Sequence, residues 1–147
     1  VDVSSSALRL AKRWSQEENL STALMRATMT QIPFRDCQFD AVISVSVIHH
    51  SVKKDISKTV SEIHRILKKK GVFLVNLASV EDPRYATGQK VENNTFRILE
   101  AVEDKRLEEL HHFFTRAEIS EVLASFDSVE VKLQREEPRY WEIIAVK

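Results

Sequence analysis

The fold is decided by residues 39–78, which read FDAVISVSVIHHSVKKDISKTVSEIHRILKKKGVFLVNLA. Residues 39–48 are nearly all β-branched or small apolar residues, which is typical of a parallel strand covered on both faces, so we place this strand near the centre of a sheet. Residues 55–70 carry an apolar stripe at helical spacing, and Gly71 is placed to end that helix in the left-handed conformation. Residues 72–78 are predicted to form a second buried strand. Because such crossovers are right-handed, this unit predicts a parallel α/β sheet.

The segment before residue 39 is predicted to contain a strand end and a helix. Residues 1–3 read as the end of a strand, and three consecutive serines then offer hydroxyl groups for a helix N-cap. The helix is indicated by one apolar stripe, formed by Ala7, Leu10, Ala11 and Trp14. Residues 22–28 are a short strand candidate, and Pro33 interrupts the pattern in a loop over residues 32–36.

The segment after residue 78 is predicted to end in an antiparallel pair of strands. Residues 79–94 should form a long loop, and residues 96–110 keep a rough helical spacing that we interpret as an acidic, solvated helix able to act as a lid. The sequence Thr-Arg-Ala-Glu at 115–118 is a capping box that should start another helix. Residues 129–133 and 140–146 then have the pattern of two closing strands.

Composition narrows the class of protein. A chain of 147 residues fits one domain, and no apolar run approaches the roughly 20 residues of a membrane-spanning helix. The 22 basic and 22 acidic residues cancel, so no bulk charge attracts nucleic acid or a membrane surface. The single cysteine, Cys37, cannot form an internal disulfide, and no signal peptide is visible. We therefore predict a single domain over residues 1–147, located in the cytoplasm.

Polar residues at the carboxyl ends of the predicted strands are the candidate ligand contacts, because open α/β sheets bind ligands there. Asp2 stands at such an end, where a carboxylate can accept hydrogen bonds from both hydroxyls of a ribose. Its alternative role is to start the helix that follows. The pair His49-His50 directly follows the strand at 39–48, and either histidine could act as a general base or orient a substrate. A hydrogen bond to loop backbone is the structural alternative.

Four of the five histidines form two adjacent pairs, His49-His50 and His111-His112. We predict no metal site, because neighbouring residues of a strand or helix point in different directions. In addition, no carboxylate or cysteine stands at a recognised ligand spacing from these histidines.

Several motifs together resemble one enzyme family. They are VDVS at 1–4, IPFRD at 32–36, FDAVIS at 39–44, IHH at 48–50 and EIHRILKKKG at 62–71. In order and spacing they resemble a class I S-adenosylmethionine-dependent methyltransferase. The stretches 82–85, 94–96 and 111–115 are similar, more loosely, to small prokaryotic members of the generic methyltransferase-domain and tellurite-resistance type.

The resemblance implies a Rossmann-like, mostly parallel sheet of seven strands with an antiparallel C-terminal strand. It also implies S-adenosyl-L-methionine bound across the carboxyl ends of the strands. By position, Asp2 would bind the ribose hydroxyls, while Val3, Thr28 and Met29 would lie near the adenine. Thr28 replaces an acidic residue that is common in the family. The methionine arm would be lined by Ser44, Val45 and Ser46, continuing to Val47, and His49 and His50 would face the substrate.

The resemblance also indicates that the sequence is N-terminally truncated. The glycine-rich loop of the family belongs to a first strand and helix that would precede Val1. That strand would lie between the strand ending at Asp2 and the strand ending at Ile48, so both would keep an unpaired edge. We interpret the chain as a fragment of a longer enzyme or as a remnant whose sheet is closed differently.

The function implied is transfer of a methyl group to a small molecule. Because the methyl group sits on an activated sulfonium, positioning can supply most of the catalysis and no acid or base is obligatory. A methyltransferase-like domain that binds a partner without catalysis is the main alternative. A nicotinamide-dependent dehydrogenase would also use Asp2. A tRNA-modifying enzyme is suggested by residues 43–50, which resemble wobble-uridine methyltransferases, although the neutral charge does not favour RNA. The sequence does not indicate an oligomeric state.

Overall fold

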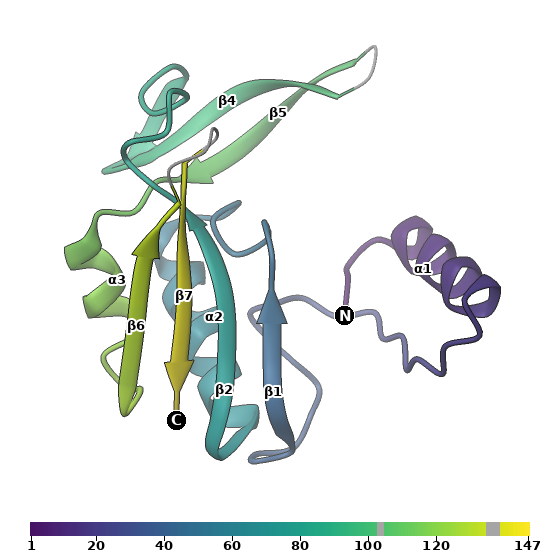
Figure 1. The fold of residues 1–147 in the computed structure, drawn as a ribbon. Coiled ribbons are helices and arrows are strands. Elements are labelled where there is room, and N and C mark those ends of the chain that lie inside the picture. The colour runs from purple at the N-terminus through teal and green to yellow at the C-terminus, as the bar shows by residue number, and fades with distance from the viewer. Residues whose placement is uncertain (103–104, 135–138) are drawn as a thin grey trace.

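A mixed four-stranded sheet organises the chain, whose residues 1–102, 105–134 and 139–147 are described by a computed structural model. The strand order is β1-β2-β7-β6, where β1 is Phe39–Ser44, β2 is Leu67–Ala78, β7 is Tyr140–Val146 and β6 is Ser128–Leu133 (Figure 1). β1 and β2 are parallel, and β7 is antiparallel to both of its neighbours. The predicted α/β class and the antiparallel C-terminal strand are confirmed.

Two helices cover one face of this sheet (Figure 1). α2, Lys53–Ile66, connects β1 to β2, and α3, Arg116–Val122, precedes β6. The core forms between alternate strand residues and the apolar stripes of both helices, and it includes Phe73, Val75, Leu77, Ile143, Ala145, Ile56, Val60, Ile63 and Ile119. No helix within the described ranges is long and apolar enough to span a membrane.

The predicted capping box starts α3. The Thr115 hydroxyl accepts a hydrogen bond from the Glu118 backbone N–H at 3.2 Å, and Glu118 Oε2 accepts one from the Thr115 backbone N–H at 3.0 Å. These reciprocal bonds satisfy two backbone donors that a helix start would otherwise leave unpaired.

The end of α2 differs from the prediction. The helix ends at Ile66, and the three lysines at 68–70 belong to β2. Gly71 does not adopt the predicted left-handed conformation; Lys70 does, with a φ of 65°. Position 71 requires glycine for a steric reason, because a Cβ there would lie 2.8 Å from the carbonyl oxygen of Lys68. Close packing of the backbone explains this glycine.

Residues 89–102 and 105–112 form a second, three-stranded antiparallel sheet and not the predicted helix. Its order is β3-β4-β5, where β3 is Gln89–Glu92, β4 is Thr95–Val102 and β5 is Lys105–His112 (Figure 1). The lid-like helix predicted over 96–110 is therefore wrong, and the loop predicted over 79–94 contains β3.

The burial pattern of β4 explains the error. Phe96 and Ile98 are buried, whereas Arg97 and Leu99 between and after them are exposed. This two-residue alternation belongs to a strand with one covered face. The covered face packs on Phe113 and Ala78, which places the second sheet above the carboxyl end of β2.

The N-terminal segment lies to the side of the main sheet (Figure 1). α1, Ser5–Glu17, begins as predicted at the serine run, because the Ser4 hydroxyl accepts a hydrogen bond from the Ala7 N–H at 3.2 Å. α1 contains no buried residue. The strand predicted over 22–28 is not formed; the segment makes an isolated parallel bridge between Asp2 and Arg26.

β1 lies at an edge of the sheet and not near its centre, as the sequence had suggested. In the part of the chain that the structure describes, its ladder partner is β2, and Ile43 is 67% exposed. Apolar composition indicates a strand suited to burial, but burial also needs a neighbour on each side. The main sheet accordingly has four strands here, where the family resemblance implied seven.

Candidate active site

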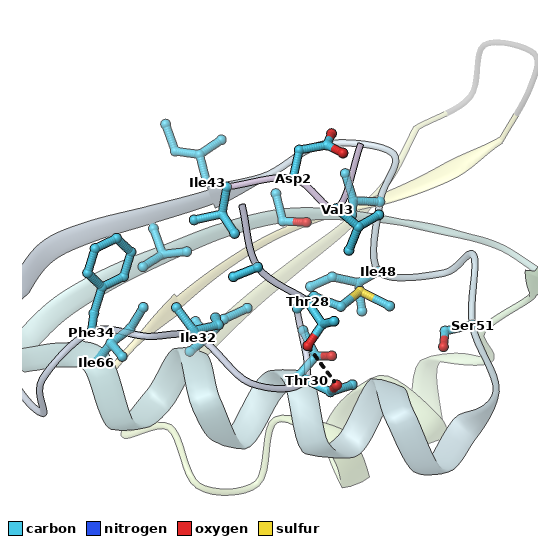
Figure 2. A pocket seen from close by; sticks show the side chains of 18 of the residues that line it. Asp2, Val3, Thr28, Thr30, Ile32, Phe34, Ile43, Ile48, Ser51 and Ile66 are labelled. Carbon is cyan, nitrogen blue, oxygen red and sulfur yellow. Dashed lines mark hydrogen bonds between the residues drawn. The ribbon is translucent and has the colours of Figure 1, made fainter. Parts of the chain in front are cut away.

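A cavity of ≈ 720 Å³ lies between β1 and the N-terminal segment (Figure 2). Its wall is mostly apolar and extends past the carboxyl end of β1 to Ile48 and Ser51. The cavity brings together six of the residues predicted to bind the cofactor, namely Asp2, Val3, Thr28, Met29, Ser44 and Val45. They come from three separate stretches of sequence, so their meeting supports the sequence interpretation of this edge.

Asp2 lies on the cavity wall and is held there by hydrogen bonds of its side chain and its backbone. Its Oδ1 accepts a hydrogen bond from the Ser4 N–H at 2.7 Å, just before α1 begins. Its backbone is fixed by the bridge to the 25–27 segment, with bonds of 3.1 Å to the Met25 carbonyl and 3.2 Å from the Ala27 N–H. The side chain therefore binds the turn before α1, whose N-cap is Ser4, and it also lies on the cavity wall (Figure 2).

Ser46 lies outside this cavity. It has a φ of 53°, and its backbone N–H donates to Asn76 Oδ1 at 2.6 Å. Ser46 instead lines a second cavity of ≈ 510 Å³ together with His50, Arg97, Glu108, Glu109 and Leu110. His50 lines both cavities, so this side chain stands between them.

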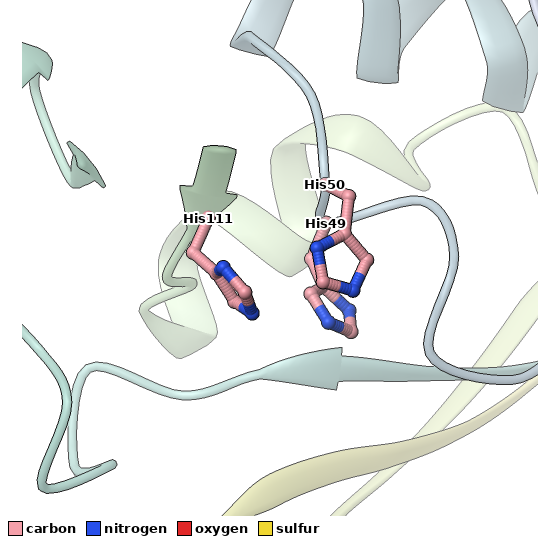
Figure 3. Close-up of side chains that lie close together, drawn as sticks. All are labelled: His49, His50 and His111. Atoms are coloured by element: carbon pink, nitrogen blue, oxygen red, sulfur yellow. The ribbon is translucent and has the colours of Figure 1, made fainter. Parts of the chain in front are cut away.

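Three histidines meet beside these cavities (Figure 3). The ring centroids of His49 and His50 are 4.4 Å apart, and those of His50 and His111 are 4.3 Å apart. His49 and His111 are fully buried, whereas the His50 side chain is 30% exposed. The loop after β1 carries the first two, and β5 carries His111. One member of the second histidine pair, His111, therefore joins the first pair in one cluster.

The electrostatic environment keeps His49 neutral. Burial lowers its pKa to about 3, and the neighbouring imidazoles of His50 and His111 and the charge of Arg84 act in the same direction, while the backbone of Asn76 opposes them. His50 has a different environment, since Glu109 Oε2 lies 3.4 Å from its Nδ1.

Arg84 is held next to the histidines by a buried carboxylate. Its Nη2 lies 2.7 Å from Asp82 Oδ2 and donates to the Tyr140 hydroxyl at 3.0 Å. Burial opposes ionisation of Asp82, but the hydrogen bonds from Arg84 outweigh it and lower the pKa of that carboxyl. The Tyr140 ring in turn lies 5.8 Å from the ring of His49.

The two remaining histidines, His112 and His64, lie outside the cluster and contact neighbouring side chains. His112 points away from the cluster, and its Nδ1 is 2.7 Å from the Thr95 hydroxyl. His64 packs edge-on against Phe126 with ring centroids 5.1 Å apart.

Sequence reasoning missed four contributors to this site, which are Arg84, Glu109, His111 and Tyr140. The only signals were that His111 belongs to a second histidine pair and that Arg84 lies in the DPRY stretch at 82–85. Neither signal identifies a contact with residues about 35 to 90 positions away in the chain, because such contacts arise from sheet pairing.

Comparison with known proteins identifies the family to which the chain belongs. A family model described as a methyltransferase domain matches residues 1–75, and the chain belongs to this family. The matched range contains the cofactor-site candidates and His49-His50, but neither β4 nor β5.

Individual relatives agree with this family. The uncharacterized methyltransferase YcgJ of Bacillus subtilis is 32% identical over 85 residues, which are 56% of this chain and 33% of YcgJ. A second curated relative, from Encephalitozoon cuniculi, is 42% identical over 53 residues, or 35% of this chain and 25% of that protein. The chain thus spans a third or less of the length of these relatives.

Solved structures share the fold. A SAM-dependent methyltransferase from Methanosarcina mazei superposes with a TM-score of 0.79 at 21% identity, covering 99% of this chain and 79% of that one. The PH0226 protein from Pyrococcus horikoshii gives a TM-score of 0.76 at 16% identity, covering 99% and 71%. The Rossmann-like methyltransferase fold inferred from the sequence is confirmed.

Proposed function

We propose that the chain forms part of an S-adenosylmethionine-dependent methyltransferase whose acceptor is a small molecule. The observation that carries this proposal is the cavity beside β1, which gathers Asp2, Thr28 and Met29 opposite Ser44 and Val45. A structural neighbour from Burkholderia thailandensis, 1,6-didemethyltoxoflavin-N1-methyltransferase, was solved with 1,6-didemethyltoxoflavin and S-adenosylhomocysteine bound. It has a TM-score of 0.60 and 17% identity to this chain.

The cavity residues fit this cofactor in size and chemistry. A volume of ≈ 720 Å³ is within the roughly 300–1,000 Å³ of small-molecule sites. The Asp2 carboxylate would accept hydrogen bonds from the ribose hydroxyls, and the side chains of Val3 and Met29 would contact the adenine. When bound, S-adenosylmethionine supplies an electrophilic methyl group.

We propose that the acceptor binds beside His50, because this residue lines both cavities. An acceptor in the second cavity would reach the first beside the imidazole. Where the acceptor must lose a proton, His50 would take it, and the Glu109 carboxylate 3.4 Å away would stabilise the resulting charge. His49 is poorly suited to be that base, since its pKa is lowered to about 3. We therefore propose that His50 accepts the proton and that His49 helps to position the acceptor.

The cofactor site is tested by calorimetric titration of the full chain with S-adenosylhomocysteine. We expect saturable micromolar binding. Asp2→Asn should weaken it about 10–100-fold, the equivalent of losing charge-assisted hydrogen bonds. The matched control is Asp40→Asn, because Asp40 is an exposed carboxylate of β1 paired with Lys68 at 2.8 Å and does not line the cavity. Circular dichroism of each preparation verifies the fold.

One observation favours a second candidate, a methyltransferase-like domain that binds a protein partner. Along and beyond the edge strand β1, Ile43 is 67% exposed and Val45 is 62% exposed, which leaves an apolar strip beside unpaired backbone. A correctly folded chain that fails to bind S-adenosylhomocysteine would contradict the enzyme proposal and favour this alternative.

A further inference from the structure

The histidine cluster has a feature that methyl transfer does not need. Neither ring nitrogen of His49 has a hydrogen-bond partner of good geometry among the described residues, although both nitrogens are buried. A buried polar atom without a partner costs free energy, so native proteins rarely keep one without a reason. A bound ion is one such reason.

We propose that His49, His50 and His111 bind a divalent transition-metal ion, with Zn²⁺ as the best match. Each residue offers one ring nitrogen, and these three atoms lie within 4.8 Å of one another. Three histidines with a fourth position left to water or substrate are a known zinc arrangement. This proposal goes beyond methyl transfer, and metal binding can be measured without cofactor or acceptor. An imidazole that ligates an ion cannot also accept a proton, so the base role of His50 applies to the chain without the ion.

The cluster must contract slightly to hold the ion. Zn–N bonds of about 2.0–2.1 Å in a tetrahedron place the nitrogens about 3.3 Å apart, so the widest pair would close by about 1.5 Å. His50 can turn toward the ion because its side chain is 30% exposed. The rings of His49 and His111 have centroids 5.5 Å apart, so these side chains would also have to rotate toward the ion (Figure 3).

The surrounding charges favour a cation. The charge of Arg84 opposes one, but Asp82 compensates it at 2.7 Å with a side chain that is fully buried. Glu109 then leaves the immediate environment with a negative charge.

Glu109 is placed to hold one of the three histidines without contacting the ion itself. It is two residues from His111 on β5, so both side chains lie on the same face of that strand. Its Oε2 is 3.4 Å from His50 Nδ1 and would orient that ring with the other nitrogen toward the ion. The fourth coordination position would face the cavities that His50 lines.

The test is a calorimetric titration of the untagged full chain with Zn²⁺ and a spectroscopic titration with Co²⁺. We expect one ion per chain and the intense visible absorption of tetrahedral Co²⁺. His49→Ala and His111→Ala should each weaken binding by more than the about 10–100-fold that losing an outer-shell partner costs. His64→Ala is the matched control and should bind as the unaltered chain does, because His64 packs on Phe126 away from the cluster.

A surface variant protects the test from misfolding. If either core substitution prevents folding, Glu109→Gln replaces it, and this change at a 37% exposed side chain should weaken Zn²⁺ binding about 10-fold or more. Substoichiometric binding, the weak spectrum of six-coordinate Co²⁺, or equal loss in His64→Ala would each overturn the proposal.

Discussion

The backbone N–H of His112 donates a hydrogen bond of 2.7 Å to the carbonyl oxygen of His49. This bond joins the last residue of β5 to the loop that follows β1, so the second sheet is attached to the main sheet at the candidate site. It also fixes the direction of both histidine pairs: His111 points to the cluster, and His112 points to Thr95. The site is consequently built from two sheets and depends on both.

The buried ion pair of Arg84 and Asp82 should be essential for stability. Arg84→Met leaves the fully buried Asp82 carboxylate without its compensating charge, and we expect a loss of about 3–5 kcal/mol in the free energy of unfolding. Arg139→Met is the control, because Arg139 pairs with Glu81 at the surface, where such pairs contribute about 0–1 kcal/mol. Urea unfolding measures both, and similar losses in the two variants would contradict the assignment.

The strand character of β4 can be tested with two neighbouring residues. Ile98→Ala should cost about 2–5 kcal/mol because Ile98 is 3% exposed, whereas Leu99→Ala should change stability by less than about 1 kcal/mol because Leu99 is 63% exposed. Thermal unfolding of both variants distinguishes the two cases. Equal losses of stability in the two variants would argue against the alternation of buried and exposed residues along β4.

The C-terminal lysine should stabilise the end of α2. Lys147 Nζ donates to the carbonyl oxygens of His64 at 2.6 Å and of Leu67 at 2.7 Å, at the end of α2, where carbonyls have no partner within the helix. Lys147→Met should lower the free energy of unfolding by about 1–2 kcal/mol. Lys69→Met, at an exposed position of β2, is expected to have little effect in the same denaturant titration.

Glu118 should make the protein sensitive to acid. Burial raises the pKa of this carboxyl, but hydrogen bonds from Thr115 and Asn94 outweigh burial and hold the pKa below its ordinary 4.5. The unfolded chain therefore binds a proton here at a higher pH than the folded chain does. Stability from this group is complete above pH 4.5 and is lost as the pH falls through the folded-state pKa.

The corresponding measurement compares Glu118→Gln with Glu121→Gln across that pH range. Glu118→Gln should be less stable than the unaltered chain at neutral pH and should show a smaller loss below pH 4.5. Glu121 is 70% exposed, so its variant should follow the unaltered chain. If the stability of Glu118→Gln fell with pH as that of the unaltered chain does, Glu118 would not be the source of the acid sensitivity.

Local sequence signals predicted the elements that depend on local interactions. The serine cap of α1 and the capping box at Thr115 involve contacts within a few residues, and so do the backbone hydrogen bonds of α2. They were predicted correctly for that reason. Six residues that the family resemblance groups together also line one cavity, and their role in cofactor binding stays a prediction.

Contacts between distant residues account for the errors. Apolar residues at 96, 99, 102, 107 and 110 satisfy a helical spacing, and only the pairing of β4 with β5 selects the strand. The meeting of His111 with His49 is a further result of that pairing. In the same way, the apolar sequence of β1 is suited to a strand with a neighbouring strand on each side. The sequence of β1 alone does not determine how many neighbouring strands it has.

The free edge of β1 also affects how samples of this chain should be handled. Unpaired backbone groups beside exposed Ile43 and Val45 can pair with the same edge of another molecule, and a formal net charge of zero supplies no repulsion against that encounter. Protein concentration and salt are therefore experimental variables for every titration described above. Light scattering before each titration will show whether the solution contains single chains or an assembly of strands.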